Sequence, residues 1–121
     1  MTTQEVANKL VSYCRSGDWE TAMKELYSPN AVSIEMPGVQ GFPERVEGME
    51  AIAKKGETWN SMVEEVHGVE VSDPIVAGDH FSCSMTMDIT MKGAPRMKNP
   101  ELCMYKVQDG KIVSEQFFYE L

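Results

Sequence analysis

The chain has 121 residues, 42% of them hydrophobic, and carries a formal net charge of −8 at pH 7. This length and composition fit a single globular domain over residues 1–121 with a buried core of its own. An acidic surface repels phosphate backbones and anionic lipids, so the charge argues against nucleic acid and membrane partners.

Two short helices are predicted at the start of the chain. Thr2 and Glu5 have the spacing of a capping box, apolar residues follow at helical spacing, and Gly17 ends the first helix. Asp18 can cap a second helix, which we expect to end at Ser28-Pro29-Asn30. Because almost nothing separates the two helices, they should pack as an antiparallel pair.

A short strand, a loop and a third helix follow. The strand is predicted over residues 31–36, and its apolar face carries Val32, Ile34 and Met36. Residues 37–45 contain two glycines and two prolines and are predicted to form an irregular loop. The third helix is expected over residues 48–62.

The rest of the chain is predicted to form long antiparallel strands. Turn signals separate residues 64–77 (with a break at Asp73-Pro74), 80–91, 97–107 and 111–121. Residues 80–91 alternate without interruption and would span about 40 Å. A chain of this size has a radius of gyration of only about 14 Å, so the sheet must twist and curve. The prediction is an α+β fold with helices on one face of a curved antiparallel sheet.

The order of several local phrases resembles the SnoaL-like branch of the nuclear transport factor 2-like (ketosteroid isomerase-like) superfamily. These phrases are GDWETAMKELYSPNAV, VEGMEAI, VHGVEVSDPIVAGDHFS and VQDGKIVSEQFFYEL. The resemblance covers essentially the whole chain. It implies a cone-shaped α+β barrel, in which a bent sheet wraps around three helices and a pocket lies at the open end. It also implies a homodimer, since many members pair through their sheets. The scaffold hosts isomerases, cyclases, hydrolases, dehydratases and binding domains, so the resemblance alone names no reaction.

The resemblance to ketosteroid isomerase suggests two site residues. That enzyme needs a carboxylate base and neutral donors that hold an oxyanion. Glu35 matches the base when the strand is aligned from Ala31, whereas Met36 matches when it is aligned from Pro37. An exposed strand glutamate is the competing interpretation of Glu35.

The donors of the oxyanion hole are equally open. Tyr13 matches the oxyanion tyrosine when counted from the start of the first helix, and Leu10 matches when counted back from its end. A structural tyrosine is therefore the alternative for Tyr13. The second donor, a protonated acid, should fall near residues 99–101, where Pro100 occupies the nearest place.

Two further candidates come from the strand pattern itself. His67 is predicted to share a face with Val69 and Val71, as either a core or pocket-wall residue or a catalytic one. Glu115 is predicted to share its face with aromatic residues, where burial would raise its pKa. It is either a functional acid or part of a salt bridge across a dimer interface.

The remaining expectations concern the pocket, cofactors and compartment. The expected pocket wall consists of Tyr13, Trp59, Tyr105, Phe117 and Tyr119. With two histidines, no metal-type cysteine spacing and no phosphate-binding or nucleophile-elbow motif, we expect no metal and no cofactor. The N-terminus lacks the apolar stretch of a signal peptide, no apolar run suits a membrane span, and the cysteines fit buried free thiols, so a cytoplasmic protein is expected.

The sequence thus favours a protein that binds a small apolar or amphipathic molecule in the cone. Cofactor-free acid–base chemistry of the isomerase or cyclase type could accompany that binding. The alternative is a non-catalytic homodimeric binding or partner-association domain.

Overall fold

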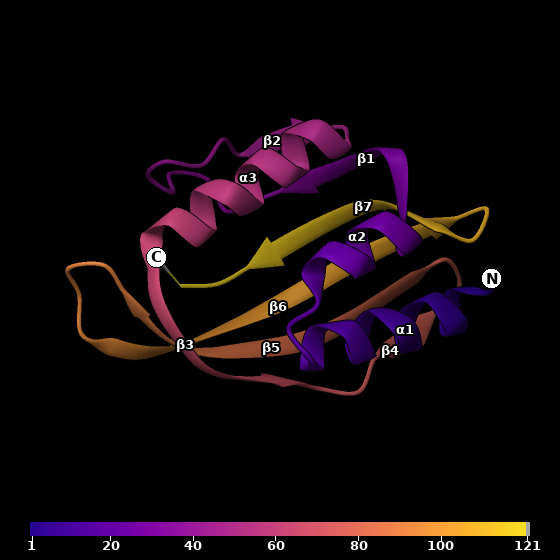
Figure 1. Cartoon of the computed structure of the whole chain (residues 1–121). Coiled ribbons are helices and arrows are strands. Elements are labelled where there is room, and N and C mark those ends of the chain that lie inside the picture. The colour runs from indigo at the N-terminus through magenta and orange to yellow at the C-terminus, as the bar shows by residue number, and fades with distance from the viewer. Residues whose placement is uncertain (121) are drawn as a thin grey trace.

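The computed structural model describes residues 1–120, in which three helices lie on one side of a strongly curved sheet (Figure 1). The helices are α1 (Thr3–Arg15), α2 (Trp19–Leu26) and α3 (Met49–Met62). In Figure 1, α1 and α2 lie together over one part of the sheet, and α3 lies over another. This arrangement confirms the predicted α+β fold.

Seven strands form one sheet, in the order β2-β1-β7-β6-β5-β3, with β4 paired to β5 outside that path. They are β1 (Tyr27–Ile34), β2 (Arg45–Glu47), β3 (Val63–Val71), β4 (Ile75–Ala77), β5 (His80–Met91), β6 (Arg96–Gln108) and β7 (Lys111–Phe118). Every pairing is antiparallel except that of β1 with β7, which is parallel. The sheet is therefore mixed, not purely antiparallel as predicted, because β1 joins it beside the last strand of the chain.

The helix starts follow the predicted capping chemistry. The Thr2 hydroxyl accepts from the Glu5 backbone N–H at 3.1 Å, and the Glu5 carboxylate accepts from the Thr2 N–H at 3.0 Å. The Asp18 carboxylate caps α2 by accepting from the backbone N–H of Thr21 at 3.2 Å. The side chains of three residues thus satisfy backbone donors that would otherwise lack partners.

Two boundaries differ from the prediction. The second helix ends at Leu26, and the strand that was expected from residue 31 already begins at Tyr27. Pro29 is tolerated there because the pairing of β1 with β7 is irregular between Tyr27 and Val32. The short strand β2 lies at the end of the predicted loop, and three residues were too few to show a periodic pattern.

The core lies between the inner face of the sheet and the helices. On β5 the predicted alternation is confirmed, since Phe81, Cys83, Met85 and Ile89 are buried. The Phe81 ring stacks on that of Tyr105, with 4.8 Å between the ring centroids. Within residues 1–120 no helix is both long enough and apolar enough to cross a membrane.

We expect Phe81→Ala to destabilise the fold by about 3 to 5 kcal/mol, because it leaves a cavity where a fully buried aromatic side chain lay. Urea denaturation would measure this change. Ile75→Ala on β4 is the control, since Ile75 is 74% exposed and its truncation should change the free energy of unfolding by less than about 0.5 kcal/mol. A loss below about 1 kcal/mol for Phe81→Ala would contradict this account of the core.

Candidate functional site

Polar side chains converge on the inner face of the sheet where β1, β7 and β6 lie side by side. Ser33 on β1 is paired with Glu115 on β7, and Glu115 is paired with Tyr105 on β6. Ala31 and Ser33 are fully buried, so the inner face of β1 is the one that continues to Glu35. The face that carries Val32 and Ile34 is the opposite one.

Glu115 is the most deeply buried carboxyl group of this cluster, with 6% of the residue exposed. Its two oxygens accept hydrogen bonds from the hydroxyl groups of Tyr27 and Ser33, the latter at 2.6 Å. Burial raises the pKa of Glu115, and these two hydrogen bonds oppose that shift. Hydroxyl donors thus supply part of the solvation that water would otherwise provide.

Glu35 is held by two partners. The ammonium group of Lys55, on α3, lies 2.9 Å from Oε2 of Glu35, and the hydroxyl of Tyr119 donates to Oε1 at 2.8 Å. The side chains of Lys55 and Glu35 are only 11% and 14% exposed. This is an ion pair shielded from solvent, unlike the exposed pairs on the helices.

Lys55 also connects Glu35 with Glu115. Its ammonium group donates to the hydroxyl of Ser33, which in turn donates to Glu115. The same ammonium lies over the ring of Phe117, 5.3 Å from the centroid. We call the connected set of Tyr27, Glu115, Ser33, Lys55, Glu35 and Tyr119 the polar network.

A third carboxyl group, Glu101 on β6, lies beside this network. Glu101 is paired with Met85, whose side chain is buried on the inner face of β5. Burial first, and then the negative charge of Glu35, raise the pKa of Glu101 to about 7. Its hydrogen-bonding partner in the protein is the Cys103 thiol at 3.7 Å, so it retains most of its capacity to bind a ligand.

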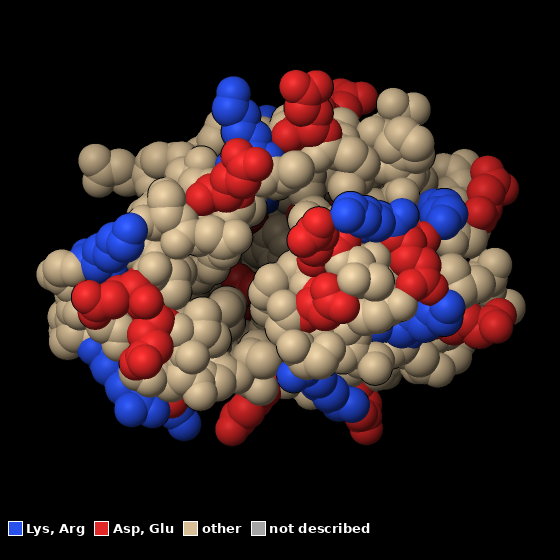
Figure 2. All heavy atoms as spheres, viewed as in Figure 1, with Lys and Arg blue, Asp and Glu red and all other residues tan. Residues whose placement is uncertain are grey.

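The surface is hollowed between the helices. Figure 2 shows a depression between α3 and the α1–α2 pair, over the sheet, with acidic side chains around its rim. Two carboxyl groups in different surroundings near such a hollow can divide the roles of acid and base between them.

The structure brings four of the predicted site residues together. Glu35, Glu115 and Tyr119 belong to the polar network, and Phe117 contacts its lysine. Trp59 is half-buried on α3, one helical turn after Lys55. Tyr105 is 3% exposed and is stacked in the core.

Tyr13 and His67 lie elsewhere. The hydroxyl of Tyr13 donates to Glu25, so it joins α1 to α2. A bulge between Val66 and Gly68 takes His67 out of the predicted alternation, and its ring contacts Thr90 at 2.8 Å. The prediction that His67 shares a face with Val69 and Val71 was therefore wrong, because a bulge shifts every later residue of a strand to the other face.

Sequence reasoning missed Lys55 and Ser33, and within residues 99–101, where it expected a protonated acid, it singled out Pro100 and not Glu101. Lys55 precedes Trp59 by four residues, so the two side chains lie on the same side of α3. Glu101 precedes Cys103 by two residues and shares its strand face. The helical period places Lys55 beside Trp59, and the strand period places Glu101 beside Cys103. The ion pair of Lys55 with Glu35, however, joins two segments that are distant in sequence.

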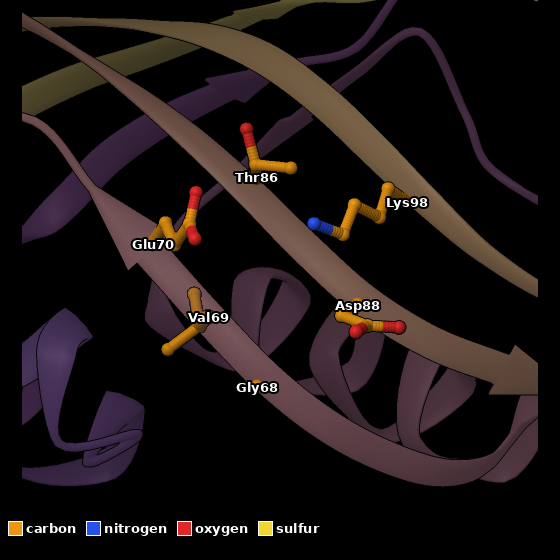
Figure 3. Close-up of a pocket in the computed structure, with 6 residues that line it drawn as sticks. All are labelled: Gly68, Val69, Glu70, Thr86, Asp88 and Lys98. Atoms are coloured by element: carbon orange, nitrogen blue, oxygen red, sulfur yellow. The ribbon is translucent and has the colours of Figure 1, made fainter.

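The outer face of the sheet carries a separate shallow depression of about 280 Å³ (Figure 3). It is lined by Gly68, Val69, Glu70, Thr86, Asp88 and Lys98. Figure 3 shows the side chains of Glu70 and Lys98 extending from β3 and β6 toward β5. The guanidinium group of Arg96 donates hydrogen bonds to the two carboxylate oxygens of Asp88, at 2.9 and 2.8 Å. In the part of the chain that the structure describes, no cluster of three His, Cys, Asp or Glu side chains could hold a metal ion.

Comparisons with known proteins point to one family. The family model of the SnoaL-like domain matches residues 1–119. A proposed SnoaL-like polyketide cyclase [carbohydrate phosphatase] from Mesorhizobium loti has 32% identity and a TM-score of 0.90, and the match covers 98% of this chain and 100% of that one. Among curated proteins, none is significantly similar in sequence to this chain.

Two more distant structures share the fold and were crystallised with small molecules. TerC, crystallised with polyporic acid, has 14% identity and a TM-score of 0.81 over 98% of this chain and 91% of that one. A protein of ketosteroid isomerase-like fold from Catenulispora acidiphila, in complex with trimethylamine, has 21% identity and a TM-score of 0.74 over 95% and 85%.

The raised pKa of Glu101 predicts a specific pH dependence of stability. The native state keeps this proton up to about pH 7, whereas a glutamate in the unfolded chain releases it near its ordinary pKa of 4.5. The protonated Glu101 side chain therefore leaves the free energy of unfolding at its full value below the pKa of the unfolded glutamate. This stability is lost as the pH rises through the pKa of Glu101 in the folded protein. Glu101→Gln removes this titration, so it should gain up to about 3 kcal/mol over the wild type between pH 4.5 and pH 8.

Urea denaturation at several pH values would measure this difference. Glu64→Gln, an exposed change on β3, is the matched control and should follow the wild type throughout. A constant difference between Glu101→Gln and the wild type across this range would show that Glu101 does not hold the proton.

Proposed function

The chain belongs to the SnoaL-like family, and from this premise we propose that it binds a small apolar or amphipathic molecule in the hollow between α3 and the sheet and moves a proton on it. The observation that carries the proposal is the pair of unlike carboxyl groups. Glu35 is paired with an ammonium group at 2.9 Å, whereas burial keeps Glu101 protonated up to about pH 7.

The two groups suit different steps of one reaction. Glu35, as a carboxylate, accepts a proton from a carbon next to a carbonyl group of the substrate. Glu101, as a neutral acid, donates a hydrogen bond or its proton to the carbonyl oxygen, on which negative charge develops. Return of the proton to another carbon, or attack of the enol on a second carbonyl, would give an isomerisation or a ring closure.

The neighbours support this class of chemistry. The related structure from Mesorhizobium loti is a proposed polyketide cyclase, and a proposed isomerase from Bacillus subtilis shares the fold with a TM-score of 0.75. The two complexes with polyporic acid and trimethylamine were made with small molecules. Three buried free cysteines fit the reducing cytoplasm, which we propose as the compartment.

Proton transfer can be tested without knowing the natural substrate. We expect the protein to accelerate exchange of deuterium from D₂O into the acidic C–H groups of 2-tetralone, followed by proton NMR. Glu35→Gln should slow this exchange by about 10²- to 10⁴-fold, the usual contribution of a positioned base. Ketone binding, followed by thermal shift, should persist because the wall of the hollow is unchanged.

Glu57→Gln, at an exposed position of α3, is the control and should exchange at the wild-type rate. Equal exchange rates for Glu35→Gln and the wild type would exclude Glu35 as the base. Binding of 2-tetralone or polyporic acid without any exchange would instead favour a binding protein.

The outer face of the sheet favours the second proposal, a homodimer. Leu102 and Phe118 are directly paired between β6 and β7, and they are 45% and 41% exposed. An exposed apolar pair of this kind on a broad sheet is typical of a surface that a second copy covers. If the hollow proves inactive, this surface supports a non-catalytic association domain.

We expect the double variant Leu102→Glu, Phe118→Glu to sediment as a monomer while the wild type sediments as a dimer, because two buried carboxylates would face an apolar partner surface. Ile75→Glu, at a still more exposed apolar position on β4, should leave the sedimentation unchanged. A wild type that sediments as a monomer at micromolar concentration would refute the dimer.

A further inference from the structure

The polar network and the neighbouring Glu101 together contain three carboxyl groups and one ammonium group. The carboxyl groups are Glu35, Glu101 and Glu115, and the cation is Lys55. A single ammonium group cannot stabilise three carboxylates equally, because electrostatic attraction falls with distance and shielding. Its position therefore determines which carboxyl group carries the charge.

Lys55 is placed unequally with respect to the three acids. It contacts Glu35 directly at 2.9 Å, and it reaches Glu115 only through the hydroxyl of Ser33. Burial and then the negative charge of Glu35 raise the pKa of Glu101, and the attraction of Lys55 does not reverse this shift. The lysine thus favours charge on Glu35, and that charge favours a proton on Glu101.

The lysine is fixed in this position by its surroundings. Its side chain is 11% exposed, its ammonium donates to both Ser33 and Glu35, and the Phe117 ring lies 5.3 Å from it. A shift toward Glu101 would cost these contacts. The ammonium therefore acts as a fixed charge in the cone.

We propose that Lys55 is a positioning residue that fixes Glu35, among the three acids, as the ionised carboxylate of the site. This inference rests on the proposed acid–base function, since it explains how two glutamates of the same chemistry take opposite roles. The lysine need not touch the substrate to do so.

The phenols of the network and the thiols near it do not replace the lysine. The phenols are those of Tyr27, at the start of β1, and Tyr119, directly after β7; the thiols are those of Cys103 on β6 and Cys14 on α1. Burial is the main cause that raises the pKa of Cys14, Tyr27 and Tyr119. For Cys103, a hydrogen bond with Cys83 and then burial raise the pKa, so all four groups stay neutral near pH 7. They can donate hydrogen bonds, but they supply no positive charge.

The test is a titration of the ligand-free protein labelled with ¹³C at the glutamate side-chain carboxyl carbons. Glu35→Gln and Glu101→Gln assign the two signals by their disappearance. In the wild type we expect the Glu101 signal to titrate with a midpoint near 7. Because the Lys55 ammonium lies 2.9 Å from its carboxyl group, Glu35 should give the signal of a carboxylate at pH 7. In Lys55→Met at pH 7, the Glu35 signal should move toward the protonated position.

Two control variants test whether the effect comes from a positive charge at position 55 of the chain. Lys55→Arg keeps the positive charge and should retain the wild-type position of the Glu35 signal. Lys54→Met removes a charge from the adjacent, exposed position of α3 and should also leave it unchanged. A Glu35 signal that stays at the ionised position in Lys55→Met would overturn the proposal.

A second measurement leaves the lysine in place and does not depend on the folding of Lys55→Met. Glu35→Gln removes the negative charge that raises the pKa of Glu101, so the Glu101 midpoint should fall from about 7. An unchanged midpoint would also overturn the proposal. Because these titrations need no substrate, they can succeed or fail independently of the exchange assay, which tests the proposed function itself.

Discussion

The hydroxyl group of Ser33 joins the two halves of the polar network. It accepts a hydrogen bond from Lys55 and donates one to Glu115, so it connects helix α3 with the centre of the sheet. Ser33 is fully buried, and both of its polar functions are used. Replacing it with an apolar residue would leave a buried lysine and a buried glutamate each short of a partner, which is among the costliest local defects in a folded protein.

This junction exists because β1 lies parallel to β7. The pairing places Ser33 beside Glu115, although 82 residues separate them in the sequence. The long strands β5 and β6 then curve the sheet so that α3 can cover this place, and the Lys55 side chain reaches down from the helix. The chemistry of the site thus depends on the curvature of the sheet.

Burying three carboxyl groups in a domain of 121 residues lowers its stability. The structure limits this cost in three ways: hydroxyl donors for Glu115, an ion pair for Glu35 and a retained proton for Glu101. Each of these solutions is also a chemical property that a substrate could use. Such a concentration of buried charge is more typical of functional sites than of structural cores.

The sequence alone predicted much of the fold and part of the candidate site. Propensity and periodicity act between residues that are close together in the chain. They therefore predicted the capping box at Thr2, the strand from His80 to Met91 and the third helix. Glu35 and Glu115 were identifiable as candidates, but the sequence left open which face of the first strand points inward. For His67, one extra residue in a bulge was enough to reverse the predicted face.

What the sequence by itself determined is the helices, the longer strands and their order, because helices, turns and alternating strands depend on neighbouring residues. Only the tertiary structure decided that β1 pairs with β7, that Ser33 and Glu35 face the cone, and that Lys55 lies between two glutamates. These contacts join segments that are distant along the chain. The ion pairing and proton affinities of the residues involved depend on burial and on distances of a few ångströms, which no local pattern of residues specifies.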